Sequence, residues 1–266
     1  MRDQIRPEGF GAPHRHFSRT DSTNTRAREL AEAGAPHGTV VTAGEQSAGR
    51  GRQGRVWTAP AGRGLLYSAV LRPLDEHHLL LPLSVPIAVC EAAESLRPDI
   101  ACQIKWPNDV WLDERKLAGI LIEARPQDGW AVIGVGLNLT VAPEEFPAEL
   151  RWPATSLFGS EERDRGQGRG SNSGEAPATL ARTPLTAAGV LSRHLECWVE
   201  EDAEAILSEW RNRDALRGRE IGWEDGASGE ELSGIADGVD ERGNLLVVTA
   251  GGDRVALGAG EVHLHL

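Results

Sequence analysis

The chain has 266 residues, of which 40% are hydrophobic, and this suits one sizeable domain with a real core plus a smaller domain. The net charge of −12 argues against general affinity for nucleic acid, because phosphate binding needs a basic surface. The three cysteines lack the spacing of a zinc site or disulfide framework, so we expect buried, reduced thiols. No apolar run approaches membrane-spanning length and the N-terminus lacks an apolar signal core, so we expect a cytoplasmic protein with no membrane partner.

The first two thirds of the chain reads as a sheet with few helices. A helix is expected at 21–34, capped by Asp21 or Ser22 and ended by Gly34. An apolar helix with a proline-disturbed start is expected at 79–96. Strands are predicted at 39–46, 64–73, 100–106, 109–124 (with a hairpin turn at its LDERK) and 130–139. Because short turns join these strands, the pattern predicts a mixed or antiparallel sheet rather than repeated strand–helix–strand units.

The last third divides into three segments. Residues 159–184 contain almost no large apolar side chains, so we expect a disordered insertion; its RGQGRG run could suggest RNA binding, but acidic neighbours favour a solvated linker. Residues 185–213 read as one long amphipathic helix. From about Gly218, short apolar runs alternate with Gly and Asp turns, including a hairpin signal at 240–244, and predict a small all-β domain.

The segment GRGRQGR (49–55) is a local cationic island. No acidic residue lies between Gln46 and Leu74, whereas five arginines do. Glycines let backbone N–H groups approach a ligand, and arginines add two-pronged donors for carboxylate or phosphate. The segment also satisfies the dinucleotide pattern G-x-G-x-x-G, but no helix-forming run follows Gly54 to hold a pyrophosphate. An RNA-binding segment, a plain surface loop and a mobile loop that closes over an anion remain the alternatives.

Lysine is nearly absent from the chain, which has two lysines and 26 arginines. Both lysines, Lys105 and Lys116, lie in KWPNDVWLDERKLAGI (105–120). Within it Asn108 and Asp109 present an amide and a carboxylate side by side, and a carboxylate near a lysine suits magnesium with phosphate, although Asn-Asp is also a common turn pair and lysines are usually solvated. A third motif, GVGLN (134–138), ends a strand with a glycine that permits close approach and an amide at Asn138.

Taken in order, DSTNT (21–25), GEQSAGRGRQGRVW (44–57), KWPNDVWLDERKLAGILIE (105–123) and GVGLN resemble the biotin–protein ligases. The resemblance implies an α+β fold: a class II aminoacyl-tRNA-synthetase-like catalytic domain with a mixed sheet at 1–216 and an SH3-like β-barrel at 217–266. It also implies two reactions. Biotin and MgATP give biotinyl-5′-AMP, and biotin then passes to a lysine of a biotin carboxyl carrier domain of an acyl-CoA or pyruvate carboxylase.

The resemblance assigns roles to residues that match the family motifs. Lys116, Arg50 and Arg52 would be catalytic, and Asp109 would bind Mg2+. The residues expected to bind biotin are Ser22, Thr23, Asn24, Gln46, Gly49, Arg50, Lys116, Gly119 and Gly134. Those expected to bind ATP are Arg52, Arg55, Trp57, Lys105, Asn108, Lys116 and Asn138.

Two further expectations follow from the chain. About twenty residues precede DSTNT, so we expect a form without the DNA-binding domain of some relatives, and no DNA partner. We also expect a monomer or weak homodimer. A lipoate–protein ligase, which shares the fold, and a nucleic-acid-binding module that is not an enzyme remain as alternatives.

Overall fold

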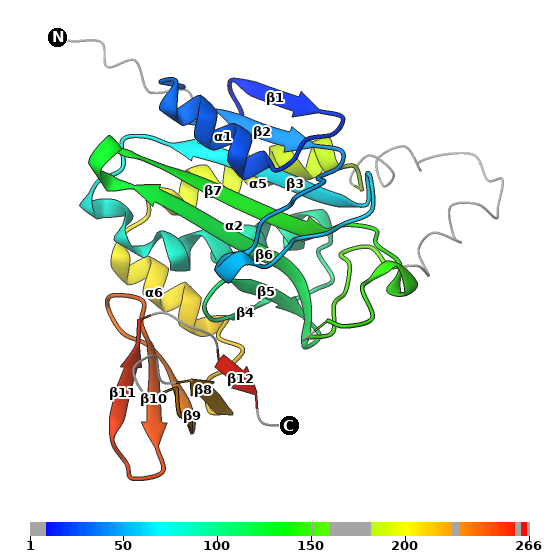
Figure 1. The fold of residues 1–266 in the computed structure, drawn as a ribbon. Helices are drawn as coiled ribbons and strands as arrows, with labels where there is room; N and C mark the ends of the chain where they lie inside the picture. Colours follow the sequence, from blue (N-terminus) through cyan, green and yellow to red (C-terminus); the bar gives the residue numbers. More distant parts are fainter. Residues whose placement is uncertain (1–8, 151, 160–181, 225–228, 259–261, 265–266) are drawn as a thin grey trace.

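The computed structural model describes residues 9–150, 152–159, 182–224, 229–258 and 262–264. A seven-stranded sheet forms the larger part of the molecule and a five-stranded sheet forms the C-terminal part (Figure 1). The large sheet has the order β1-β2-β3-β7-β6-β5-β4, and only β1 and β2 pair in parallel, which confirms the predicted mixed sheet. Its strands are β1 (His14–Phe17), β2 (Val40–Ala43), β3 (Gly64–Leu71), β4 (Gln103–Lys105), β5 (Asp109–Leu112), β6 (Arg115–Arg125) and β7 (Trp130–Asn138).

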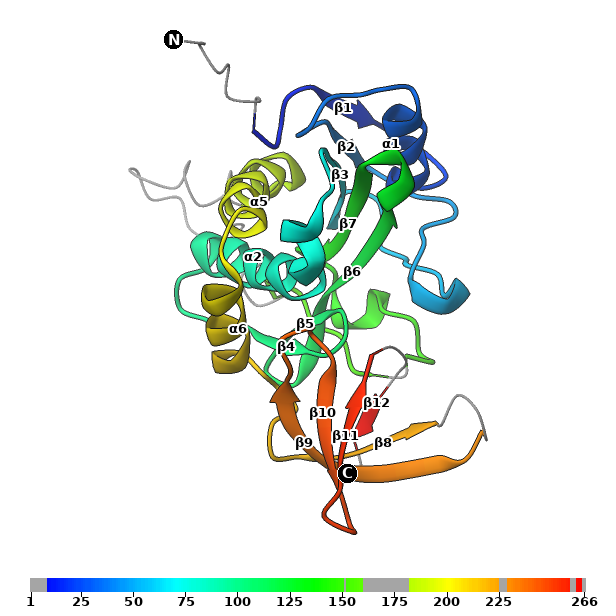
Figure 2. The same ribbon diagram turned by 90° about the vertical axis from the view of Figure 1, so that its left-hand side faces the viewer.

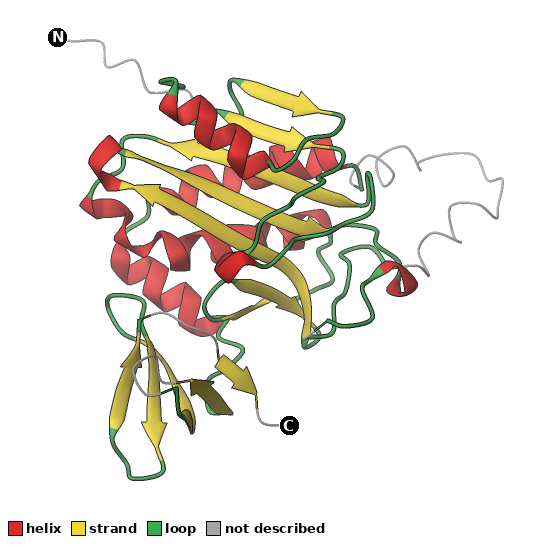
Figure 3. Ribbon diagram, in the orientation of Figure 1, coloured by secondary structure: helices red, strands yellow, loops and turns green. Residues whose placement is uncertain are grey.

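Helices cover both faces of this sheet. Figure 2 shows α1 on one side and α2, α5 and α6 on the other. The helices are α1 (Thr23–Glu32), α2 (Leu81–Leu96), α5 (Pro184–Val199) and α6 (Ala203–Asn212), and short 3-10 turns lie at η1 (Arg52–Gly54), η2 (Glu76–Leu80), η3 (Pro126–Asp128) and η4 (Pro143–Glu145). Figure 3 shows short connections from β4 to β5, β5 to β6 and β6 to β7, whereas α1, α2 and the loop after β2 make the longer connections of the large sheet.

The two faces of β7 explain where the molecule opens. Side chains alternate along a strand, so Ile133 and Val135 point into the main core that contains α2 and α5. On the opposite face Val132 packs with α1, but the next two positions on that face are glycines, Gly134 and Gly136. The core is therefore continuous on one side, while the α1 side has room for a ligand.

The helix preceding the KWPND motif is a core helix. Residues Glu76–Leu96 are long and apolar enough to cross a membrane by length and composition, so the expectation that no apolar run has this length is wrong. However, 67% of the most apolar window is buried inside the protein, where α2 packs on α5 and the sheet. A core helix with this burial needs no membrane to explain its composition.

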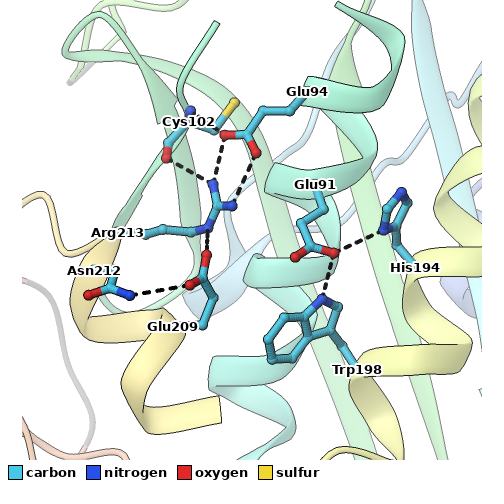
Figure 4. Close-up of polar contacts among 8 residues, drawn as sticks. All are labelled: Glu91, Glu94, Cys102, His194, Trp198, Glu209, Asn212 and Arg213. Carbon is cyan, nitrogen blue, oxygen red and sulfur yellow. Dashed lines mark hydrogen bonds and ion pairs between the residues drawn. The ribbon is translucent and has the colours of Figure 1, made fainter. Parts of the chain in front are cut away.

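The expected long helix at 185–213 is two helices, α5 and α6. Asp202 Oδ1 accepts a hydrogen bond from Ala205 N at 2.8 Å, so this aspartate caps a new helix instead of continuing the old one. Polar contacts then tie both helices to α2 (Figure 4). Glu91 of α2 accepts a hydrogen bond of 2.7 Å from Nε1 of Trp198 in α5. Glu94 of α2 forms an ion pair of 2.7 Å with Arg213 at the end of α6.

The small C-terminal sheet agrees with the expected SH3-like domain. Its strands are β8 (Glu220–Glu224), β9 (Glu231–Val239), β10 (Leu245–Thr249), β11 (Arg254–Leu257) and β12 (Val262–Leu264), all antiparallel. The predicted β9–β10 hairpin forms because Asp240 Oδ1 accepts from Asn244 N at 2.9 Å and Gly243 takes a φ of 81°. The sheet also joins the large part, since Trp106 Nε1 donates to Gly243 O at 3.2 Å.

Some expectations fall at the edge of what the structure describes. Residues 160–181, nearly all of the expected insertion, lie outside the described residues. Its expected C-terminal limit is wrong, because Thr183 caps α5 and Pro184 begins it. Buried cysteines are confirmed at Cys90 and Cys102, but Cys197 is exposed, since it lies on the outer side of α5.

Candidate active site

A cavity of about 580 Å³ opens on the α1 side of the large sheet. Its floor consists of β6 and β7, where Gly119 and Gly136 lie opposite each other in the strand register. With Gly134, these residues leave the floor without side chains, and neighbouring groups fill only part of the space. The four motifs quoted from the sequence, 21–25, 44–57, 105–123 and 134–138, meet around this floor.

Trp57 lies directly on two of these glycines. A Cβ added at Gly136 would come within 2.3 Å of the Trp57 ring, and one at Gly119 within 2.9 Å. Only glycine therefore lets the indole lie flat against the sheet. The Trp57 Nε1 atom is buried and has no hydrogen-bond partner among the residues that the structure describes. The indole thus presents an aromatic wall at the cavity, with its N–H group turned against the floor at Gly136.

The first turn of α1 brings a polar wall to the other end of the cavity. Asn24 lies so close to the floor that a Cβ at Gly134 would be 2.0 Å from its Oδ1 atom. The Asn24 amide is fixed, because Nδ2 donates to Glu123 Oε2 at 2.9 Å and to Leu121 O at 3.3 Å. Oδ1 therefore faces the hydroxyl of Ser68 at 2.6 Å.

The polar wall contains more acceptor oxygens than hydrogens. Gln46 Oε1 accepts from Thr23 N at 2.7 Å, which fixes its orientation, and contacts Thr23 Oγ1 at 3.0 Å. Thr23 Oγ1 lies 2.8 Å from Ser68 Oγ. Ser68 Oγ also contacts Oδ1, the side-chain amide oxygen of Asn24. These three oxygen–oxygen contacts share only two hydroxyl hydrogens. The wall therefore suits a ligand that supplies N–H donors.

The glycine–arginine segment forms a tight hairpin beside the cavity. Gly51 N donates to Arg55 O at 2.8 Å, and Trp57 N donates to Gly49 O at 3.0 Å. The turn is the three-residue η1, in which Gln53 has a φ of 54°. No helix follows, as predicted, so the dinucleotide-binding interpretation of G-x-G-x-x-G fails. Arg50, Arg52 and Arg55 all line the cavity.

The two lysines lie at the end of the cavity formed by β4, β5 and β6. Lys116 Nζ is 2.7 Å from Asp109 Oδ1 and 5.7 Å from the Trp57 ring centroid. Lys105 is buried, and its Nζ donates to Val262 O at 3.3 Å in the C-terminal sheet and lies 5.1 Å from the Trp152 ring. The β5–β6 hairpin predicted from LDERK thus brings Lys116 back beside the KWPND motif.

The two asparagines of this end hold neighbouring backbone. Asn108 Nδ2 donates to Ile120 O at 2.8 Å, and Asn138 Nδ2 donates to Thr155 O at 3.1 Å. Their amide nitrogens stabilise the cavity wall, and their carbonyl oxygens are the atoms that remain for a ligand or a hydrated ion.

The residues at this end fit a magnesium ion that substrate phosphates share. Mg2+ is usually held by one or two carboxylates together with waters and phosphate oxygens. Asp109 offers one such carboxylate, and the described residues contain no group of three or more His, Cys, Asp or Glu side chains that would enclose an ion. In the structure the Lys116 ammonium forms an ion pair with the Asp109 carboxylate. A magnesium ion bound to Asp109 would take the place of that ammonium group.

All but one of the residues predicted for the site line the cavity. They are Ser22, Thr23, Asn24, Gln46, Arg50, Arg52, Arg55, Trp57, Lys105, Asn108, Asp109, Lys116, Gly119, Gly134 and Asn138. Gly49 does not line it. A Cβ there would come within 2.2 Å of Trp57 O, so this glycine allows the two strands of the hairpin to approach each other.

Several lining residues were not predicted as site residues. Gly136 was noted only for its freedom of approach, and Tyr67, Phe146, Leu150, Trp152 and Val262 carried no motif signal. Val262 comes from the C-terminal sheet and reaches the cavity only through the packing of the two parts. Glu123 is the last residue of the 105–123 motif and was given no role from the sequence, but it touches two lining residues, Asn24 and Arg50.

Comparison with known proteins agrees with this geometry. Residues 16–139 match the model of the biotin/lipoate A/B protein ligase family, and residues 218–264 match that of the biotin protein ligase C-terminal domain. The biotin–[acetyl-CoA-carboxylase] ligase of Mycobacterium tuberculosis is 33% identical over 274 residues, covering 100% of this chain and 94% of that protein. The bifunctional ligase/repressor BirA of Bacillus subtilis is 40% identical over 145 residues, which span 51% of this chain but only 43% of that relative.

Solved structures give the same result. The biotin protein ligase of Aquifex aeolicus in complex with biotin and ATP superimposes with a TM-score of 0.70 at 27% identity, covering 96% of this chain and 99% of that chain. The biotin protein ligase of Leishmania major in complex with biotinyl-5-AMP has a TM-score of 0.60 at 27% identity, covering 93% and 99%. The full-length match to the mycobacterial ligase, together with these folds, shows that the chain belongs to the biotin protein ligase family.

Proposed function

We propose that the protein activates biotin with MgATP to biotinyl-5′-AMP and then transfers the biotinyl group to a lysine of a biotin carboxyl carrier domain. The observation that carries the proposal is the polarity of the cavity on the α1 side of the sheet. Its α1 end is an oxygen-rich wall that needs N–H donors, and its other end holds Lys105 and Lys116. Biotin has a ureido group at one end and a carboxylate at the other, and it fits this order.

The α1 wall favours biotin over lipoate. The ureido ring carries two N–H groups that can donate to the oxygens of Thr23, Asn24 and Gln46, which line the cavity, whereas the dithiolane ring of lipoate carries none. Leaving such a polar wall without donors costs affinity, because buried acceptors lose their water partners. The family model covers both ligase types, and this wall distinguishes them.

The cationic end supports the first chemical step. A carboxylate oxygen of biotin forms a bond to the α-phosphorus of ATP, and the bond to pyrophosphate breaks. Negative charge grows on the departing group, so catalysis depends on positioning and electrostatic stabilisation. Lys116 lies where an ammonium can contact both carboxylate and α-phosphate once its ion pair with Asp109 opens. Magnesium held at Asp109 would neutralise phosphate charge.

The second step transfers the acyl group. The neutral amine of a carrier lysine attacks the acyl carbon of the mixed anhydride, AMP leaves with the bonding electron pair, and the nitrogen loses a proton. Water must stay out before the carrier arrives, since the anhydride hydrolyses. The hairpin at 49–57 projects from the sheet on the same side as α1 (Figure 2) and lines the cavity with Arg50, Arg52, Arg55 and Trp57, so it is the segment that can supply the cover. The names of the relatives support a carboxylase carrier as acceptor.

Two finer properties belong to the same proposal. The acidic net charge of −12 supports an enzyme without sequence-specific DNA binding, and we expect a monomer or a weak homodimer. A discrete footprint on DNA at physiological salt would contradict the first. Light scattering across a concentration series, with and without biotin and ATP, measures the second.

The exchange of labelled pyrophosphate into ATP tests the proposed activation. We expect exchange that requires biotin and magnesium and that lipoate does not support. Exchange with lipoate alone would identify a lipoate ligase. Absence of exchange with either acid, combined with salt-dependent binding to RNA or DNA, would favour the nucleic-acid-binding alternative.

A further inference from the structure

Glu123 joins two parts of the cavity that are far apart in the sequence. It lies on β6, and its carboxylate contacts Asn24 of α1 and Arg50 of the glycine–arginine hairpin. We propose that Glu123 is a positioning residue that latches the hairpin to the biotin-facing wall, so that loop closure and wall geometry depend on one carboxylate. The functional part of this inference rests on the proposed function.

The first arm of the latch orients Asn24. Glu123 Oε2 accepts from Asn24 Nδ2 at 2.9 Å, which turns the amide oxygen toward Ser68 at 2.6 Å. Asn24 Oδ1 is the last acceptor in the series of hydrogen-bonded oxygens from Gln46 through Thr23 and Ser68. It is the atom that would accept a hydrogen bond from a ligand N–H. The absence of a side chain at Gly134 leaves just enough space for this amide. A change at position 123 therefore alters the wall without touching the ligand.

The second arm anchors the hairpin. Arg50 Nη1 lies 3.0 Å from Glu123 Oε1 and 3.2 Å from Oε2. Arg50 also pairs with Val56 across the hairpin, so holding its guanidinium holds both strands of the turn. The guanidinium points at β6, and this geometry assigns Arg50 to loop anchorage.

A carboxylate is needed because both arms are donors. An ionised carboxylate accepts on both oxygens, whereas a glutamine accepts on one and turns an NH2 group toward the other donor. Glu123→Gln therefore keeps the shape, removes the charge opposite Arg50 and leaves one oxygen for both donors, so both contacts weaken. The pair is partly exposed, with 42% of the Arg50 side chain and 21% of the Glu123 side chain accessible, so the ion pair alone contributes modestly.

The ligand-free protein gives the first test. Trypsin cleaves after Arg52 and Arg55, and mass spectrometry of the fragments measures how often the hairpin opens. We expect Glu123→Gln and Arg50→Gln each to speed these cleavages about three- to tenfold. The matched control is Glu29→Gln, which breaks an Arg26–Glu29 ion pair of 2.8 Å on the surface of α1 and leaves the hairpin alone. Unchanged cleavage in Arg50→Gln, which alters an exposed side chain, overturns the latch.

A double-mutant cycle gives the second test. If Glu123 holds the loop through Arg50, adding Glu123→Gln to Arg50→Gln should not increase cleavage in the hairpin further. The Asn24 arm should persist in that background as a higher KM for biotin at unchanged KM for ATP. Independent, additive effects on hairpin cleavage, or a biotin KM that does not move, contradict the proposal. The trypsin result stands even if the wild-type protein shows no biotin-dependent exchange, so failure of the latch and failure of the proposed function are separable.

Discussion

Lys116 occupies a position that arginine could not fill in the same way. Its Nζ atom sits 2.7 Å from Asp109, and its Cε atom would be 3.3 Å from a Cβ at Gly119. A compact ammonium fits this space and can move from the carboxylate to a phosphate, whereas a guanidinium is longer, planar and fixed in its donor directions. The survival of lysine here, in a chain that otherwise uses arginine, agrees with this geometric demand.

Replacing Lys116 by arginine should abolish adenylation and leave the protein folded. We expect at least a hundredfold loss of kcat in pyrophosphate exchange, because a transition-state contact of about 2.7 kcal/mol or more disappears. Circular dichroism should show native structure. The reverse exchange Arg115→Lys, at the exposed neighbouring position, serves as the control and should keep wild-type activity. Near-normal exchange in Lys116→Arg would make the lysine incidental.

Adding one methyl group at Gly134 should damage the biotin wall. The new Cβ would lie 2.0 Å from Asn24 Oδ1, so Asn24 must leave its contacts with Ser68 and Glu123. We expect biotin affinity, measured by calorimetry, to fall about tenfold or more, since a buried polar contact is lost. Gly189→Ala adds the same methyl group in α5 where nothing lies within 4 Å, and it should bind biotin normally. Unchanged affinity in Gly134→Ala would argue against the wall as the binding surface.

At the scale of elements, a polar network fixes the helices behind the sheet. Glu94 Oε1 accepts from Arg213 Nη1 at 2.7 Å and from Cys102 N at 2.8 Å, so α2, α6 and the entry to β4 share one carboxylate (Figure 4). Burial disfavours the charged Arg213 guanidinium, but its hydrogen bonds and ion pair with Glu94 outweigh this and raise its pKa above the usual value. β4 ends at Lys105, so the network connects the helices to the site.

Removing the Glu94 carboxylate should destabilise the whole fold. Glu94→Ala leaves the Arg213 side chain, only 14% accessible, with a reduced set of acceptors. We expect the free energy of unfolding in urea to fall by about 2–3 kcal/mol, as for a broken, largely buried ion pair. Glu29→Ala, which removes an exposed pair on α1, should change it by less than about 0.5 kcal/mol. Equal losses in the free energy of unfolding for the two substitutions would show that the buried network contributes no more to stability than an exposed ion pair.

Local signals in the sequence predicted most elements but not all. The β5–β6 and β9–β10 turns follow from their own residues, as Asp240 and Gly243 show. β1 was missed because its four residues are largely exposed and its partner β2 lies beyond α1. The break between α5 and α6 was missed because helix periodicity continues across it, while the capping bond of Asp202 decides the geometry.

At the scale of the molecule, the C-terminal sheet completes both the core and the site. Ile221, Val247 and Val262 belong to the same buried cluster as the core of the large sheet. The connection passes through residues 213–215, which pair with β4: Ile104 N donates to Arg213 O at 2.7 Å, and Ala215 N donates to Ile104 O at 2.9 Å. A shared core predicts one cooperative unfolding transition for the two parts.

This connection contains a carboxyl group that senses pH. Burial raises the pKa of Asp214 to about 6 from its usual 3.8. The folded state therefore holds the proton more tightly than the unfolded state, and this contribution to stability is complete below about pH 3.8 and is lost as the pH rises through about 6. Leu216 N donates a hydrogen bond to Asp214 Oδ1 at 2.8 Å. Asp214→Asn removes the charge of this side chain but keeps an oxygen that can accept that hydrogen bond.

We expect Asp214→Asn to raise the free energy of unfolding at pH 7.5 by about 1–3 kcal/mol. The gain should shrink as the pH falls from 6 toward 4. Urea unfolding at both ends of this range measures it, with the exposed Asp253→Asn as control. A gain that is the same at both ends would mean that ionisation of Asp214 is not its cause.

The candidate site was predictable where one motif carries the chemistry and unpredictable where packing supplies the residue. The motifs delivered Lys116, Asp109 and the polar residues of α1 because each lies in a short, distinctive stretch. Val262 reaches the cavity because the C-terminal sheet packs against the large part of the molecule, and Trp152 reaches it because a loop packs beside Lys105. Glu123 becomes visible only when the strand register places it beside Arg50 and Asn24.

Transfer of biotin to a carrier domain tests the central claim most directly. The purified protein, biotin, ATP and magnesium are incubated with a biotin carboxyl carrier domain, and intact mass spectrometry follows the carrier. The account predicts one biotinyl group on one carrier lysine, dependent on ATP, absent with Lys116→Arg and not replaced by a lipoyl group when lipoate is supplied. A carrier that stays unmodified by the folded wild-type protein, or one that accepts lipoate in place of biotin, would contradict it.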